Sequence, residues 1–119
     1  MRSLLLSLLL LTLSVSASDV PLLLVGGDGY AYFISHEEQK PRLFAARQGS
    51  RARVGIPPVY GLFPAKTGVF ANADEKVWLI EQGQPTKIAD GVLVDAATAS
   101  DGTYLYLWQE QGLSVLFVP

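Results

Sequence analysis

Acidic residues in short turns are the first candidates for chemistry in this sequence. Asp28, Asp74 and Asp101 each lie in a turn that leads into an aromatic-rich stretch, and Asp95 follows an apolar stretch. Two carboxylates that face each other across a cleft can hydrolyse a polymer by acid–base catalysis. Aspartate also caps hairpins and tolerates the backbone of a tight turn. The turn role accounts for these residues, so we expect no catalytic residue, and hydrolysis stays an alternative.

The single histidine, His36, gives no indication of a catalytic or metal centre. A nucleophilic triad needs a histidine that deprotonates the nucleophile, and the sequence has no Gly-x-Ser-x-Gly motif. Glu37 and Glu38 are consecutive, so their carboxylates diverge and do not form a preformed metal site. The chain has no cysteine, which excludes disulfides and a cysteine-type zinc site. We expect no metal, no cofactor and a non-enzymatic protein.

Three apolar stretches, residues 30–34, 76–80 and 104–108, carry aromatic residues at equivalent alternate positions: Tyr30 and Tyr32 in the first, Trp78 in the second, and Tyr104, Tyr106 and Trp108 in the third. Side chains alternate across a strand, so residues two apart share a face. An exposed tyrosine or tryptophan offers a flat apolar body and a polar tip, which suit a sugar ring or a protein partner. If the stretches stack as separate sheets, both faces are buried and the aromatics are packing residues. The candidate binding residues are Tyr32, Trp78, Tyr106 and Trp108.

A basic stretch without any acid extends over residues 40–53. Its charges suit the acidic face of a partner, an anionic lipid or a glycan, and positive charges on an edge strand also discourage aggregation. The whole chain has a net charge of −2, which gives no general electrostatic reason to bind nucleic acid. The basic patch consists of Arg42, Arg47, Arg51 and Arg53.

The stretches that must position these residues are short, rich in Val, Ile, Tyr, Phe and Trp, and separated by Gly, Pro and Asp, which is typical of strands and tight turns. Three similar copies begin at residues 21, 68 and 92, and each predicts a three-stranded antiparallel meander. Their aligned middle strands place Asp28 and Asp74 in equivalent turns. Residues 45–67 interrupt the rhythm, and residues 51–56 or 59–63 are a fourth strand or a crossover. Residues 35–39 form one helical turn or a polar loop.

The last copy carries a family resemblance. Gly91-Val-Leu-Val-Asp, followed by Ser-Asp-Gly-Thr-Tyr-Leu-Tyr-Leu-Trp and Leu-Ser-Val-Leu-Phe, resembles one blade of an NHL-type β-propeller. The resemblance implies stacked meanders and a binding role. A closed propeller needs about four or more blades of some forty residues, so the chain is too short to close one. The predicted fold is all-β: an open propeller-like stack of meanders, or a small sandwich or barrel.

The N-terminus has the parts of a Sec-type signal peptide. Arg2 precedes an apolar run over residues 4–15, and Val15-Ser-Ala17 gives a cleavage site after Ala17, with Ser18 as the alternative. The run is shorter than the roughly 20 residues that span a bilayer. We therefore predict a signal peptide over residues 1–17 and a single domain over residues 18–119, periplasmic or secreted, with no membrane span after cleavage.

These observations favour a small exported binding or interaction protein of the cell envelope. An open stack leaves strand edges that natural proteins cover or pair, so we expect self-association or an envelope protein or glycan as partner. Two alternatives stay open: a hydrolase of an envelope or extracellular polymer that uses turn aspartates, and a propeller remnant without independent activity.

Overall fold

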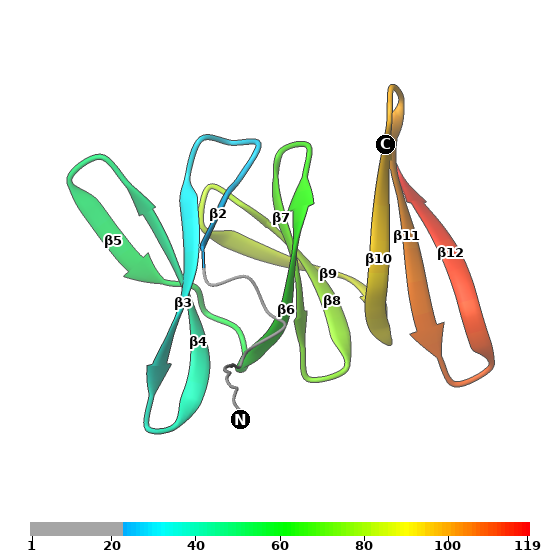
Figure 1. The fold of residues 1–119 in the computed structure, drawn as a ribbon, viewed down its shortest axis with the longest axis horizontal. Coiled ribbons are helices and arrows are strands. Elements are labelled where there is room, and N and C mark those ends of the chain that lie inside the picture. The colour runs from blue at the N-terminus through cyan, green and yellow to red at the C-terminus, as the bar shows by residue number, and fades with distance from the viewer. Residues whose placement is uncertain (1–22) are drawn as a thin grey trace, which may run out of the picture.

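The structure, a computed structural model, describes residues 23–119. The predicted signal peptide and its cleavage site lie outside these residues. The described chain is all-β, with three antiparallel sheets arranged in chain order (Figure 1). Within residues 23–119 no helix has the length and apolar character needed to cross a membrane.

The first two sheets have four strands and the third has three, and in each sheet every strand pairs with its neighbour in sequence. The first sheet contains β2 (Leu23–Val25), β3 (Ala31–Glu37), β4 (Lys40–Arg47) and β5 (Ser50–Arg53). The second contains β6 (Val59–Ala65), β7 (Gly68–Ala73), β8 (Lys76–Glu81) and β9 (Gln84–Asp90). The third contains β10 (Val92–Ala99), β11 (Gly102–Gln109) and β12 (Gly112–Val118).

Tight hairpin turns set the register of these strands. Asp74 and Glu75 have φ values of 57° and 55° in the β7–β8 turn, and consecutive positive φ values give the backbone twist that matches paired strands. Glu38 and Gln39 form the same kind of turn, with φ values of 53° and 66°. Residues 35–39 are therefore the end of β3 and a two-residue turn, and the expectation of a helical turn or polar loop is wrong.

Residues 45–67 contribute two edge strands, β5 and β6, rather than one. Strand β5 extends the first sheet, and β6 begins the second. Pro64 lies in β6, which tolerates it because β6 is an edge strand. The extra strand displaces the predicted alignment: Trp78 lies on the third strand of its sheet, whereas Tyr32 and Tyr106 lie on the second strand of theirs. Asp28 and Asp74 therefore do not occupy equivalent turns.

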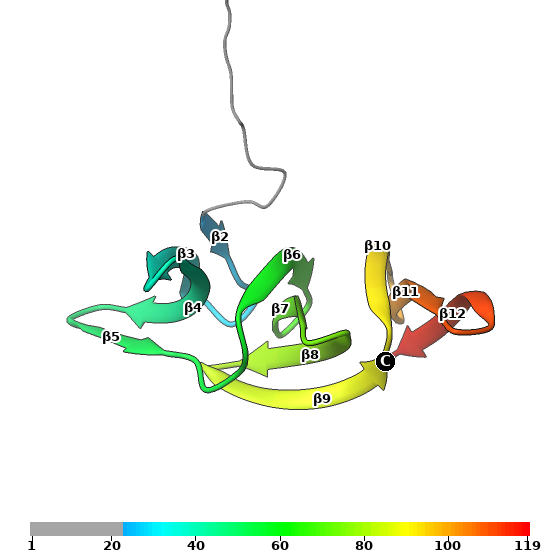
Figure 2. The ribbon, with the colours of Figure 1, turned by 90° about the horizontal axis from the view of Figure 1, so that it is seen from below.

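The sheets pack face to face through two hydrophobic clusters. One joins the first and second sheets and includes Tyr32, Leu43 and Ile80; the other joins the second and third and includes Phe70 and Leu105. Strand β7 alternates between them, since Val69 and Ala71 belong to the first cluster and Phe70 to the second. The second sheet is thus covered on both faces, and the three sheets form a layered stack that Figure 2 shows from a second side.

Candidate functional site

The third sheet buries one face against the second sheet and exposes the other. Register places Val92, Trp108 and Leu113 in one row across β10, β11 and β12, with Asp95, Tyr106 and Val115 in the next row. A third row contains Ala97, Tyr104 and Phe117. The buried residues Leu93, Leu105 and Leu107 alternate with these and point to the second sheet. We call the three rows the β10–β12 outer face.

This outer face is apolar and open. Trp108 is 59% exposed, Leu113 61% and Val115 59%, and Val92, Tyr104 and Phe117 are also exposed. The Tyr104 and Phe117 rings pack on each other with centroids 4.9 Å apart. Asp95 is the only charged residue in the three rows. A solvated antiparallel sheet face is usually polar, and a contiguous apolar patch on a soluble protein marks an interaction site.

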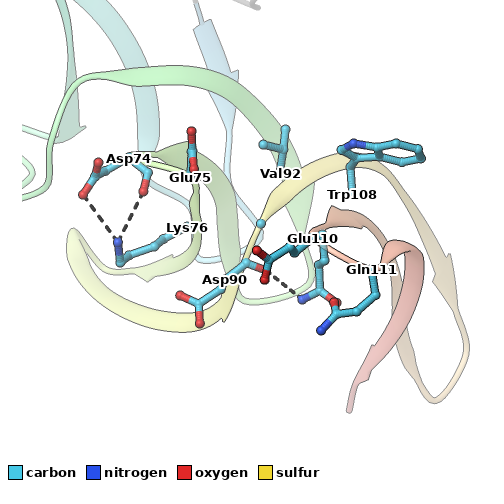
Figure 3. A pocket seen from close by; sticks show the side chains of 10 residues that line it. Asp74, Glu75, Lys76, Asp90, Val92, Trp108, Glu110 and Gln111 are labelled. Atoms are coloured by element: carbon cyan, nitrogen blue, oxygen red, sulfur yellow. Dashed lines mark hydrogen bonds and ion pairs between the residues drawn. The ribbon is translucent and has the colours of Figure 1, made fainter.

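A pocket of about 870 Å³ adjoins this face at the end where the β7–β8 turn, the β9–β10 link and the β11–β12 turn meet. Its lining includes Trp108 and the carboxylates of Asp74, Glu75, Asp90 and Glu110 (Figure 3). Lys76 Nζ lies 3.4 Å from Asp74 Oδ2, and Lys87 Nζ lies 2.9 Å from Asp90 Oδ1. Two of the four carboxylates are therefore ion-paired.

The pocket does not gather the carboxylates into a metal centre. Among residues 23–119, no group of three or more His, Asp or Glu side chains is arranged to hold a metal ion. Lys87 holds the pKa of the Asp90 carboxyl below its ordinary value, so this group stays ionised and is a poor general acid. The pocket is an acidic, open surface beside Trp108.

The four predicted aromatic residues have different environments. Tyr32 is fully buried between the first two sheets, so the expectation that it forms part of a binding surface is wrong. Trp78 is half-buried against the same cluster, and its Nε1 donates a hydrogen bond of 3.1 Å to the Ala73 carbonyl. Tyr106 is half-buried and Trp108 exposed, both on the β10–β12 outer face. The structure brings together only the last two.

Asp28 is part of a polar clamp between the first two sheets. Its Oδ2 accepts hydrogen bonds from the Tyr32 hydroxyl at 2.6 Å and from the Gln82 backbone N–H at 2.6 Å, and its Oδ1 accepts one from the Tyr30 N–H at 3.0 Å. Burial opposes ionisation, but these donors outweigh it and lower the pKa of Asp28. Burial, together with the bond to Asp28, raises the pKa of Tyr32. Asp28 therefore has a structural role.

The other two turn aspartates, Asp74 and Asp101, do not lie beside Asp28. Asp101 lies in the β10–β11 turn of the third sheet. This turn is at the same end of the stack as the β2–β3 turn that holds Asp28 (Figure 1), but the second sheet lies between the first and third sheets. Asp74 lies in the β7–β8 turn, at the opposite end. The three residues therefore do not form a pair of facing carboxylates.

The basic patch lies on strands β4 and β5 of the first sheet. Arg42, Arg51 and Arg53 share a face with Phe33 and Phe44, which is the face away from the second sheet. Arg53 Nη1 lies 3.3 Å from Glu37 Oε1. Arg47 stands at the end of β4, where its guanidinium packs over the Tyr30 ring at 5.4 Å and donates a bond to the Tyr30 hydroxyl.

Sequence reasoning missed the contribution of β12 to the exposed face. The signal was present, since Leu113-Ser-Val-Leu-Phe-Val is apolar at nearly every position and a strand buried on both faces has that pattern. No protein-family model matches the chain, and no similar protein was found among curated proteins or solved structures.

Proposed function

We propose that this chain is an exported, non-enzymatic interaction protein of the cell envelope, and that its β10–β12 outer face binds a protein partner. Export rests on the signal-peptide pattern of residues 1–17. The three sheets are interpreted as successive blades of a propeller-like repeat, with the binding surface on the last of them.

The observation that carries the proposal is the composition of the outer face. Trp108 and Tyr106 lie in adjacent rows of β11, with Leu113 and Val115 beside them on β12. Aromatic residues surrounded by aliphatic ones are typical of the centre of a protein interface, where tryptophan and tyrosine contribute most of the binding free energy. The carboxylates of the neighbouring pocket supply the polar rim that such an interface has.

The hydrolase alternative receives no comparable support. Asp28 uses both carboxylate oxygens in hydrogen bonds, and Asp74 is ion-paired to Lys76. The three donors commit the Asp28 carboxylate to the contact between the first two sheets, and acid–base hydrolysis needs a second carboxylate facing it across a cleft.

Site-specific photocrosslinking in the producing cell tests the proposal. A photoreactive amino acid is placed at Trp108 or Val115, and a matched control is placed at Tyr60, a 65% exposed aromatic on the second sheet. We expect protein adducts from positions 108 and 115 and none from position 60. Equal yields from all three positions, or adducts from none, would refute the proposed binding face. Adducts to glycan alone would redirect the proposal to a sugar ligand.

A further inference from the structure

The stack repeats one relation between sheets, and the third sheet continues it. On β3, Tyr32 points to the second sheet, and on β7, Phe70 points to the third. On β11 the corresponding side is the outer face, with Tyr106 at its centre. The second strand of each sheet therefore has an aromatic residue on the side that corresponds to the next sheet along the chain. Tyr32 and Phe70 are covered by the next sheet, whereas no sheet within residues 23–119 covers Tyr106 on β11.

The first sheet exposes the opposite kind of face. Leu23, Val25, Phe33 and Phe44 lie on the side of this sheet that points away from the hydrophobic clusters. Leu23 is 63% exposed and Val25 67%, and the Phe33 and Phe44 rings stack at 5.4 Å. We call this side the β2–β5 outer face. In the second sheet the equivalent side is buried, because the first sheet covers it.

The two outer faces have opposite charge. Arg42, Arg51 and Arg53 lie on the β2–β5 outer face, and Glu37 on the same face pairs with Arg53, which leaves the face with a net positive charge. The segment 91–119, which forms the third sheet, has three acidic residues and no lysine or arginine. Pairing either face with itself would bring like charges together, whereas pairing one face with the other places Asp95 and the acidic rim opposite arginines. Complementary charge therefore favours contact between unlike faces.

We propose that the chain associates head to tail with a second copy of itself, with the β10–β12 outer face of one copy packed on the β2–β5 outer face of the next. This inference rests on the proposed function and names the partner of that binding face. The contact is heterologous, so it forms a ring if the rotation between copies closes and a filament if it does not.

Light scattering of the purified chain and of two complementary variants tests the inference. Val115→Arg adds a positive charge to the acidic face, and Val25→Glu adds a negative charge to the basic face, so each variant blocks one face. We expect the unmodified chain to have at least twice the single-chain mass at micromolar concentration. We expect each variant alone to have the single-chain mass. We expect an equimolar mixture to have at least double that mass, because each variant keeps the face that the other lacks and the two introduced charges are opposite.

Three outcomes overturn the inference. A single-chain mass for the unmodified protein at every concentration excludes a second copy as the partner. An assembled Val25→Glu variant indicates contact between two like faces, and so does a mixture that stays monomeric although far-ultraviolet circular dichroism shows both variants folded. If either variant fails to fold, Leu113→Arg and Leu23→Glu replace it on the same faces. A monomer that still forms photoadducts with another protein at position 115 leaves the proposed function standing while this inference fails.

Discussion

Removal of the Tyr32 hydroxyl is the sharpest test of how the first two sheets are held together. Tyr32→Phe keeps the buried ring but deletes an oxygen that donates a hydrogen bond to Asp28 at 2.6 Å and accepts one from the Gly83 N–H at 3.1 Å. Gly83 lies in the β8–β9 turn of the second sheet. The Gly83 bond joins the two sheets directly. The Asp28 bond lies within the first sheet and fixes the carboxylate that accepts the Gln82 N–H of the second sheet.

The expected loss follows from the two bonds. A hydrogen bond to a charged group contributes about 1.5–3 kcal/mol and a neutral one about 0.5–1.5 kcal/mol. Asp28 is partly exposed, so water replaces part of its lost bond. We therefore expect Tyr32→Phe to lower the free energy of unfolding by about 2–3 kcal/mol. This is a large share of the roughly 5–15 kcal/mol that a domain of this size has.

Urea denaturation followed by circular dichroism measures this loss, and Tyr30→Phe is the matched control. The Tyr30 hydroxyl accepts only an exposed bond from Arg47, so its removal should change stability by less than about 0.5 kcal/mol. In a double-mutant cycle with Asp28→Asn, we expect Tyr32→Phe to show a coupling of roughly 1–2 kcal/mol, because the two residues share one hydrogen bond.

The contribution of Asp28 should also depend on pH with a defined sign. Its pKa in the folded chain is lower than its ordinary value of 3.8. A carboxyl with a depressed folded-state pKa contributes stability that is fully present above the unfolded-state pKa and is lost as the pH falls through the folded-state value. The stability difference between the unmodified chain and Asp28→Asn should therefore be constant above about pH 5 and decrease below about pH 4.

Either of two results would refute this reasoning. One is a Tyr32→Phe variant as stable as the Tyr30→Phe control. The other is a difference between the unmodified chain and Asp28→Asn that stays the same from neutral pH down to pH 3. Either would mean that the Tyr32–Asp28 clamp contributes little to holding the first two sheets together.

Two further substitutions test the packing of the stack. The Asn72 side chain donates a hydrogen bond to the Leu93 carbonyl and accepts one from the Leu93 N–H, each at 2.8 Å. Asn72→Ala should therefore lower the free energy of unfolding by about 2–3 kcal/mol and speed amide hydrogen exchange in the third sheet more than in the first. Equal acceleration in all three sheets would contradict a contact that acts only between β7 and β10. A Cβ on Gly27 would lie 1.9 Å from the Lys66 carbonyl oxygen, whereas one on Gly55 meets nothing within 4 Å. Gly27→Ala should therefore destabilise by at least about 1–3 kcal/mol and Gly55→Ala by much less, and equal melting temperatures for the two variants would exclude the close approach of the first two sheets.

Apart from the Glu38-Gln39 turn, the strand pattern and the turns were predictable from sequence because both depend on local chemistry. Alternating apolar residues and Asp, Gly or Gln turns specify hairpins without reference to the rest of the chain. The all-β fold and its antiparallel sheets are confirmed. Strand β5 was not identified with certainty, because Ser50-Arg-Ala-Arg53 is exposed at every position and is held by backbone pairing to β4. A strand without a buried residue leaves no hydrophobic signal.

Whether each aromatic residue is buried or exposed could not be predicted from the sequence, and the physical reason is a different one. Tyr32 and Tyr106 occupy similar strands with similar neighbours, yet Tyr32 is buried and Tyr106 is half-exposed. The local sequence specifies which side of a strand a residue lies on. Whether that side is covered depends on the next sheet in the stack, and the sequence around Tyr106 contains no information about its presence.

The composition of the β10–β12 outer face is that of a buried surface in an exposed position. A face that had only to meet water would keep polar residues at alternate positions of β11 and β12, as the exposed positions of β5 do with arginine. Instead Tyr104, Tyr106 and Trp108 alternate with the buried Leu105 and Leu107, so both sides of β11 are apolar. A strand of this composition is suited to the interior of a stack. A further layer packed on the outer face would explain why both sides of β11 are apolar.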